Sequence, residues 1–271
     1  MSKRNTQQAK NAARERLRME RERQARKEKT KRQVLVGLSI VAVLAVAGGV
    51  GYAVMQANKP SGWDAAKNAK LVKPANTSGT NGTTLVVGKP DAKKTLTMYE
   101  DLRCPICSQF EQTVGPTVKK DIDSGKYNVK YVLATFIDSN GGEGSKNALS
   151  ALGAALNVSP EAFEAYKTAL YSAKWHPEET DDKFKDDSYL IKVADTVDAL
   201  KGNKAFQKAV NDGTYDRWAL EMSKTFDKNK DEVTGTPSLV VDGKKLTGSD
   251  GKNTPMTVPD FQKAMDAALK A

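Results

Sequence analysis

The stretch TLTMYEDLRCPICSQF, residues 95–110, contains both cysteines of the chain. Residues 95–102 alternate apolar and polar side chains and predict a strand, whereas residues 108–122 place apolar side chains at helical spacing. The Cys-Pro-Ile-Cys motif, residues 104–107, lies between them. A thiolate at the beginning of a helix faces unpaired N–H groups and the positive end of the helix dipole, which lowers its pKa. The pattern predicts a dithiol redox centre at a strand-to-helix junction.

The two cysteines are expected to have different roles. Cys104 precedes the helix and is the thiol that attacks or is attacked, whereas Cys107 lies one turn inside, is shielded, and resolves the mixed disulfide. Pro105 suits the first helical turn, where no N–H bond is lost. Ile106 offers the thiolate neither positive charge nor an N–H donor. We therefore predict a Cys104 pKa below the ~8.5 of a free thiol but above the ~3.5 of the most acidic CxxC thiols.

The cysteine and histidine counts limit the metal chemistry. The chain has two Cys and one His, too few to complete a zinc site that needs four such ligands. A metal site is therefore not predicted, and the pair favours redox chemistry. Two thiolates suffice for linear Cu(I), so a non-catalytic Cu(I)-binding module remains an alternative.

Charge divides the chain into an anchor region and a nearly neutral remainder. Residues 1–32 hold 13 of the 43 Lys and Arg residues but only 4 of the 33 Asp and Glu residues, and they predict a basic cytoplasmic arm. Residues 33–57 are apolar, and from Val34 to Ala57 only Tyr52 is ionisable, which predicts an uncleaved transmembrane signal anchor. The rest is then extracytoplasmic. Its balanced charge argues against a nucleic-acid partner.

The residues after the predicted anchor fall into a linker and one folded domain. Residues 58–83, rich in Asn, Gly, Ser, Thr and Pro, predict a flexible extracytoplasmic linker. Residues 84–271 predict an α/β domain. Its strands precede and follow a helical insertion at about 142–230, and a helix closes the chain. Asp242-Gly243 predicts a hairpin turn within the last strands.

At this point the chain resembles a known family. The run Tyr99-Glu100-Asp101-Leu102-Arg103-Cys104-Pro105-Ile106-Cys107, the helical insertion and Gly235-Thr236-Pro237-Ser238 resemble the DsbA-like thioredoxin-fold oxidoreductases, particularly the membrane-anchored Gram-positive and actinobacterial type. The resemblance covers about residues 84–270. It implies a thioredoxin fold and implies that Thr236 and Pro237 form a cis-proline loop beside Cys104 that binds substrate peptide. An ordinary trans proline at the beginning of a strand is the alternative.

Two departures from the family pattern bear on the chemistry. Many relatives have His where Ile106 stands, and many place a buried carboxylate where Met98 stands. Glu100 or Asp101 is then a candidate proton shuttle for Cys107, against the simpler interpretation of a solvated or salt-bridged carboxylate at a strand end. The single histidine, His176, is interpreted as a loop residue of the insertion rather than a catalytic group.

The resemblance also implies what the protein acts with. It implies an extracytoplasmic thiol-disulfide oxidoreductase, a dithiol oxidase that passes its disulfide to cysteine-containing exported proteins. It needs no organic cofactor, because the Cys104–Cys107 disulfide carries the electrons. A membrane reoxidase of the DsbB or vitamin K epoxide reductase type is the implied partner. The same residues also suit a reductase or an isomerase, because direction depends on potential and electron supply.

Overall fold

The computed structural model describes residues 62–270 of the chain. The predicted cytoplasmic arm, residues 1–32, and the predicted transmembrane anchor, residues 33–57, lie outside the described residues. Within residues 62–270, none of the helices combines the length and the apolar character that a membrane crossing requires.

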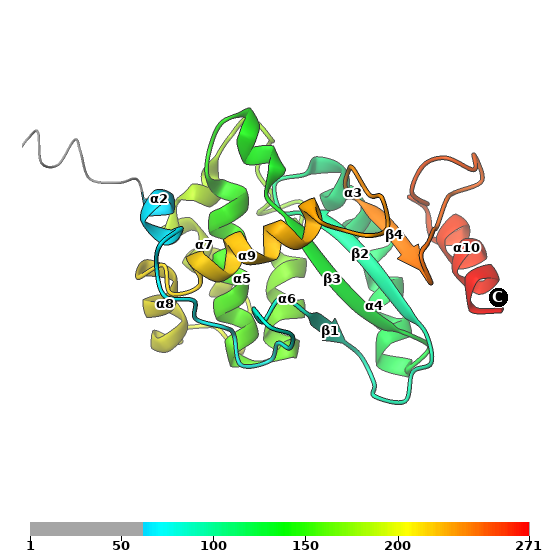
Figure 1. The fold of residues 1–271 in the computed structure, drawn as a ribbon, viewed down its shortest axis with the longest axis horizontal. Helices are drawn as coiled ribbons and strands as arrows, with labels where there is room; N and C mark the ends of the chain where they lie inside the picture. The colour runs from blue at the N-terminus through cyan, green and yellow to red at the C-terminus, as the bar shows by residue number, and fades with distance from the viewer. Residues whose placement is uncertain (1–61, 271) are drawn as a thin grey trace, which may run out of the picture. The chain divides into compact units, whose positions relative to one another are not determined.

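A five-stranded mixed sheet lies at the centre of the described unit (Figure 1). Its strands in chain order are β1 (Leu85–Val87), β2 (Thr95–Asp101), β3 (Asn128–Ala134), β4 (Ser238–Val241) and β5 (Lys244–Lys245). The spatial order is β1-β3-β2-β4-β5; β2 and β3 are parallel, and the other neighbours are antiparallel. The central strand β2 therefore ends at an interior position of the sheet, directly before the Cys-Pro-Ile-Cys motif.

The segment between β2 and β3 forms two helices rather than one. These are α3 (Pro105–Thr113) and α4 (Gly115–Ser124), with Val114 between them. Gly115-Pro116 explains the break, because proline lacks the N–H that an uninterrupted helix needs and clashes with the preceding turn. The first helix begins at Pro105, three residues earlier than the apolar spacing over residues 108–122 indicates.

The predicted helical insertion is confirmed. It comprises five α-helices: α5 (Gly144–Val158), α6 (Pro160–Tyr171), α7 (Asp187–Ala194), α8 (Lys204–Asn211) and α9 (Asp216–Asp227). Two short 3₁₀ turns, η1 (Phe136–Asn140) and η2 (Lys183–Lys185), precede α5 and α7. The insertion thus connects the end of β3 to the beginning of β4.

Alternation along β2 assigns its side chains to two cores. Leu96 and Met98 belong to the main apolar core, whereas Tyr99 belongs to a smaller cluster that includes Phe226 of α9. Helix α9 contacts β3 and crosses in front of it in Figure 1. Because side chains two residues apart share a face, Glu100 is directed toward the main core with Met98. This placement decides the surroundings of the cysteines.

The C-terminal elements follow local sequence signals. Asp242 and Gly243 both have positive φ, 50° and 74°, as a tight hairpin turn between β4 and β5 requires. The closing helix α10 (Val258–Lys270) begins with the Asp260 N–H donating to Thr257 Oγ1 over 3.3 Å. The predicted hairpin and closing helix are confirmed.

Residues 62–83 differ from the flexible linker predicted over 58–83. The short helix α2 (Gly62–Ala66) buries Trp63. Further along, the Trp218 Nε1–H donates to the Gly82 carbonyl oxygen over 2.6 Å, and Asn76 donates to the Leu156 carbonyl oxygen. Composition alone indicated a linker, but these long-range contacts attach the segment to α5 and α9. The packed unit therefore begins well before Thr84.

Candidate active site

Cys104 is the N-cap residue of α3. Its φ and ψ, −72° and 116°, are extended, and its Sγ accepts a hydrogen bond from the Cys107 backbone N–H over 3.4 Å. The sulfur therefore lies where the unpaired N–H groups and the positive dipole end of the helix converge. Cys104 is 6% exposed and Cys107 is fully buried, which agrees with the predicted order of accessibility.

The surroundings of Cys104 stabilise its thiolate. Its pKa is lowered from 9.0 to about 6, and the hydrogen bond from the Cys107 thiol contributes most. Burial opposes the shift, whereas the Thr236 side chain and the backbone N–H groups of Ile106 and Cys107 support it. The value lies within the range predicted from the sequence. Ile106 contributes through its backbone, since its side chain carries no donor.

Cys107 has the opposite electrostatic environment. Burial raises the pKa of its thiol well above 9.0, and its interactions with Cys104 and with Glu100 raise it further. Both cysteines are free thiols in the structure. At neutral pH, Cys104 is therefore the thiolate of the pair and Cys107 is the protonated thiol.

The loop before β4 lies beside Cys104. The Thr236–Pro237 peptide bond is cis, and the Cys104 Sγ is 3.5 Å from the Thr236 carbonyl oxygen. The Thr236 Oγ1 is shielded from solvent and has no hydrogen-bond partner among residues 62–270, so its hydroxyl is available to donate to a Cys104 thiolate. The structure thus brings together both halves of the predicted site, which are more than 130 positions apart in the chain.

Glu100 is a buried, ion-paired carboxylate rather than a solvated one. It is fully buried, and its Oε2 lies 3.4 Å from the Lys167 ammonium of α6. Lys167 also lies 2.7 Å from Glu111 Oε1. Burial raises the pKa of Glu100 well above 4.5; Lys167 lowers it, and Glu111 raises it. A buried carboxyl group with a raised pKa therefore acts electrostatically on the buried Cys107 thiol.

Asp101 has a structural environment. Its carboxylate accepts hydrogen bonds from the Ser145 hydroxyl, at 2.6 Å, and from the backbone N–H groups of Arg103 and Ile137. Burial raises its pKa to about 6, and these hydrogen bonds oppose the shift. Ile137 belongs to η1 and Ser145 belongs to α5, so these hydrogen bonds connect the end of β2 to both elements.

Arg103 and His176 hold the chain immediately before Cys104. The buried Arg103 guanidinium lies 2.9 Å from Asp138 Oδ1 and donates to the Gly141 and Glu179 carbonyl oxygens. His176 Nε2 is 3.1 Å from the Leu102 carbonyl oxygen, and burial lowers the pKa of its imidazole. His176 is a loop residue of the insertion, as predicted, and it supports the active-site loop rather than facing the sulfur atoms.

Three residues of the site were not predicted from the sequence: Lys167, Glu111 and Arg103. Glu111 and Cys107 are four residues apart, a spacing that places both on one face of a helix, so this signal was available. Lys167 carries no local signal, because it is 67 positions from Glu100. Within residues 62–270, no group of three or more His, Cys, Asp or Glu side chains is arranged to hold a metal ion.

Comparison with known proteins places this geometry in a family. A family model described as Thioredoxin matches residues 80–267. The chain is 25% identical over 244 residues to "Probable disulfide bond formation protein D" of Bacillus cereus, which covers 87% of this chain and 97% of that protein. It is also 25% identical over 163 residues to "Disulfide bond formation protein D" of Bacillus subtilis, covering 59% of this chain and 68% of that protein.

Solved structures agree with the family. Oxidised DsbA of Mycobacterium tuberculosis is 26% identical, has a TM-score of 0.52, and covers 68% of this chain and 99% of its own. Oxidised BdbD of Bacillus subtilis, at 20% identity, shares the fold with a TM-score of 0.55 and covers 74% of this chain and all of its own.

Proposed function

This chain belongs to the thioredoxin family and is a thiol-disulfide oxidoreductase of the DsbA type, and from that premise we propose that it works as a dithiol oxidase that forms disulfides in exported proteins. The observation that carries the direction is the difference between the two thiols. The pKa of Cys104 is lowered to about 6, whereas that of Cys107 is raised. Stabilising the Cys104 thiolate stabilises the reduced protein, which makes its disulfide the stronger oxidant.

The proposed cycle transfers two electrons from substrate to protein. A substrate thiolate attacks Cys104 Sγ of the Cys104–Cys107 disulfide, that S–S bond breaks, and Cys107 leaves with the electron pair and takes up a proton. A second substrate thiolate then attacks the substrate sulfur of the mixed disulfide. Cys104 leaves as a thiolate, and the substrate disulfide is formed. No organic cofactor enters this cycle.

Glu100 is the proposed proton donor to the departing Cys107 thiolate. Its carboxyl group is fully buried and acts electrostatically on Cys107, and burial raises its pKa, which favours uptake of a proton by this group. In the reverse step, the same group accepts the proton as Cys107 becomes a nucleophile. The Asp101 carboxylate already accepts hydrogen bonds from Arg103, Ile137 and Ser145, so we do not assign it this role.

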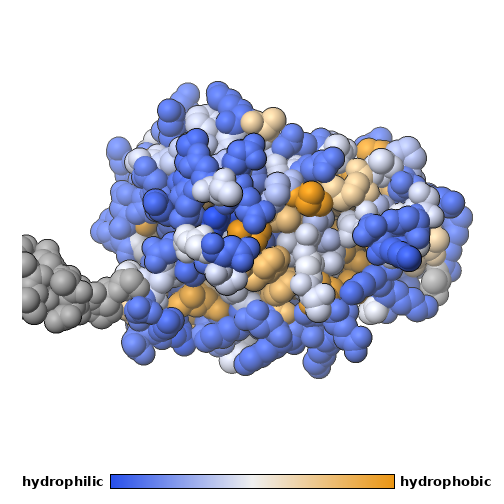
Figure 2. All heavy atoms as spheres, turned by 90° about the horizontal axis from the view of Figure 1, so that it is seen from above, coloured by the Kyte–Doolittle hydropathy of each residue, from blue (hydrophilic) through white to orange (hydrophobic). Residues whose placement is uncertain are grey.

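An exposed apolar side chain within the redox motif suits unfolded polypeptides as substrates. Ile106 is 48% exposed within the motif, and Phe136 of η1 is 38% exposed. Figure 2 shows apolar patches on a mainly hydrophilic face of the described unit. Thr236 and Pro237 supply the backbone beside Cys104 with which an extended substrate segment pairs.

We propose the membrane-anchored Gram-positive and actinobacterial type, with residues 1–32 cytoplasmic, residues 33–57 crossing the membrane and the redox domain outside. The basic arm and the apolar run that follows it support this arrangement. Cysteine-containing exported proteins are the proposed substrates, and a membrane reoxidase of the DsbB or vitamin K epoxide reductase type is the proposed source of oxidising equivalents. Protease added to cells with opened outer layers should digest the redox domain; a protected domain contradicts this topology.

Oxidative refolding tests the oxidase direction. The oxidised chain should refold reduced ribonuclease in the absence of glutathione, and Cys104→Ser should abolish this activity. Equilibration with glutathione should give a potential more oxidising than that of thioredoxin, ~−270 mV. Activity confined to insulin reduction supports the alternative of a reductase or isomerase. Absence of both activities together with stoichiometric Cu(I) uptake supports the binding-module alternative.

A further inference from the structure

A buried charge cluster extends from Cys107 to one face of α6. At its centre is Lys167, which is 1% exposed and lies 2.7 Å from Glu111 Oε1 and 3.4 Å from Glu100 Oε2. Burial opposes the charge of this ammonium group, but Glu100, Glu111 and Glu164 outweigh that effect and raise its pKa. Lys167 is therefore charged at rest, and three carboxyl groups act on it.

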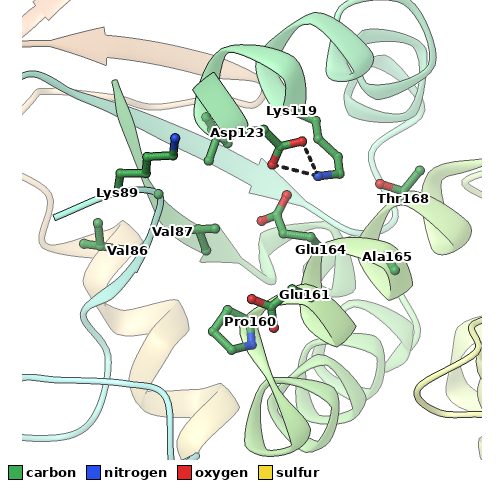
Figure 3. A pocket seen from close by; sticks show the side chains of 12 residues that line it. Val86, Val87, Lys89, Lys119, Asp123, Pro160, Glu161, Glu164, Ala165 and Thr168 are labelled. Atoms are coloured by element: carbon green, nitrogen blue, oxygen red, sulfur yellow. Dashed lines mark hydrogen bonds and ion pairs between the residues drawn. The ribbon is translucent and has the colours of Figure 1, made fainter. Parts of the chain in front are cut away.

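Glu164 connects this cluster to solvent. It lies three residues before Lys167 on α6, so both side chains share one face of the helix. It also lines a cavity of about 620 Å³ between the end of β1, α4 and α6. Figure 3 shows its carboxylate extending from α6 into this cavity toward the Lys119–Asp123 ion pair. Its Oε1 is shielded and has no hydrogen-bond partner among the described residues.

The titratable groups that face the cluster come from five elements. They are Glu100 of β2, Cys107 and Glu111 of α3, Lys119 of α4, Tyr131 of β3, and Glu164, Lys167 and Tyr171 of α6. Burial raises the pKa values of Glu100 and Glu164, and Lys167 lowers both. One ammonium group cannot compensate three ionised carboxylates in a buried site, so the cluster holds at least one exchangeable proton.

We propose that Glu164 is the solvent-side end of a proton path that runs through Lys167 and Glu111 to Glu100 and Cys107. The inference rests on the proposed role of Glu100. When the Cys104–Cys107 bond breaks, the Cys107 thiolate takes the Glu100 proton. A proton from Glu164 then moves along Lys167 and Glu111 to Glu100, and water in the cavity reprotonates Glu164. One proton enters the protein and ends on Cys107, and the charge of the cluster is the same before and after the transfer.

Burial makes such a path necessary. Cys107 and Glu100 are both fully buried, so neither exchanges a proton with water directly. Lys167 and Glu111 are also buried. Glu164 is the member of the cluster that lines a cavity open to solvent. A carboxyl group that is shielded at one oxygen and adjoins water is suited to pass protons in either direction.

Single-turnover kinetics on the full chain test the path. The oxidised protein is mixed with a dithiol peptide, and disulfide exchange is followed by quenched mass spectrometry while a pH indicator dye reports proton uptake in weak buffer. In Glu164→Gln, proton uptake should slow by about tenfold. A group that transfers a proton directly to the reacting atom contributes about 10²–10⁴-fold to the rate, and the effect here should be smaller because Glu164 acts through other residues. Acetate buffer should restore the rate, and the equilibrium with glutathione should change less than about twofold.

Glu161→Gln is the matched control, because Glu161 lines the same cavity from the same helix but is exposed. It should take up protons at the wild-type rate. Glu164→Asp retains a carboxyl group and should preserve most of that rate, so this variant tests the path even where Glu164→Gln folds poorly. Equal slowing by Glu161→Gln and Glu164→Gln overturns the path. If Glu164→Gln takes up protons at the wild-type rate while disulfide exchange is slow in Glu100→Gln, the path is overturned but the role of Glu100 remains. Wild-type rates in both overturn the role of Glu100 as well.

Discussion

Two chemically identical thiols become a reactive and a resolving group through their positions on one helix. Cys104 caps α3 and receives hydrogen bonds, whereas Cys107 lies one turn inside, in an apolar environment next to a carboxyl group. The difference arises because the helix end supplies donors only to its first residues. We therefore expect a substrate sulfur to join Cys104. Cys107 leaves when the protein oxidises a substrate, and it attacks the mixed disulfide in the reverse direction.

Removing the resolving thiol should trap substrate. In Cys107→Ser, a mixed disulfide on Cys104 persists because no internal thiol can displace the substrate. The trapped species should be visible on non-reducing gels and should disappear with reductant. Cys104→Ser serves as the matched control and should trap nothing. Equal trapping by both variants contradicts the assigned roles.

The acidity of Cys104 should be visible in a pH titration of the reduced protein. Thiolate absorbance at 240 nm should rise with a midpoint near pH 6, and Cys104→Ser should remove this transition. Because the pKa is lowered by folding, the thiolate stabilises the reduced fold above the unfolded thiol's pKa near 9, and this contribution is lost as pH falls through about 6. A midpoint near 9 contradicts the helix-end stabilisation.

Ile106 limits how oxidising the protein is. Ile106→His places a positive or N–H-donating group beside the Cys104 thiolate, so it should lower the Cys104 pKa further. Each tenfold gain in thiolate stabilisation should raise the potential by ~30 mV in a glutathione equilibrium. Ile106→Leu is the matched control and should leave the potential unchanged. A potential unaffected by histidine shows that the side chain at this position does not act on the sulfur.

At the scale of elements, the active-site loop is attached to the helical insertion by charge. The buried Arg103 guanidinium contacts Asp138 of η1, and Asp138 in turn accepts hydrogen bonds from the first N–H groups of α5 at Ser145 and Lys146. This one carboxylate therefore caps a helix and orients the residue before Cys104. The insertion is part of the structure that holds the redox motif.

Removing the Arg103 charge should be costly. Arg103→Met retains a chain of similar length but leaves Asp138 and Asp182 without the guanidinium, and removing one partner of a buried ion pair costs about 3–5 kcal/mol. Urea unfolding should show this loss. Lys208→Met, which removes the exposed pair with Asp212, should cost less than about 0.5 kcal/mol. Similar losses in both variants contradict a buried network.

The elements that the sequence predicts are those with local signals. These are the strand before Cys104, the helix after it, the Asp242-Gly243 hairpin and the closing helix. Each depends on residues within a few positions of one another. The surroundings of Glu100 depend on which helix covers its face of the sheet. Alternation along β2 puts Glu100 beside Met98, but nothing near it in the chain shows that α6 brings Lys167 there. Glu100 and Lys167 are 67 positions apart in the chain, so tertiary packing brings them together.

At the scale of the whole described unit, composition was misleading at residues 62–83. The segment is polar and rich in Gly and Asn, yet Trp63 is buried and Gly82 accepts a hydrogen bond from the Trp218 indole. Asn81 Nδ2 also donates to Glu221 of α9 over 3.0 Å. A few anchoring contacts suffice to order a segment whose average composition is typical of a linker. The segment covers parts of the insertion and belongs to the folded unit.

Truncation should reveal this contribution. A chain that begins at residue 84 loses Trp63 and leaves the Trp218 indole N–H without its carbonyl acceptor, so its free energy of unfolding should fall by at least about 3 kcal/mol, the lower value for truncating a buried aromatic side chain. A chain that begins at residue 62 is the matched control, because it retains every contact described for the segment. The two chains are compared by urea unfolding with tryptophan fluorescence. Superimposable curves contradict the packing of residues 62–83, whereas a lower midpoint confined to the shorter chain shows that the segment stabilises the domain that carries Cys104 and Cys107.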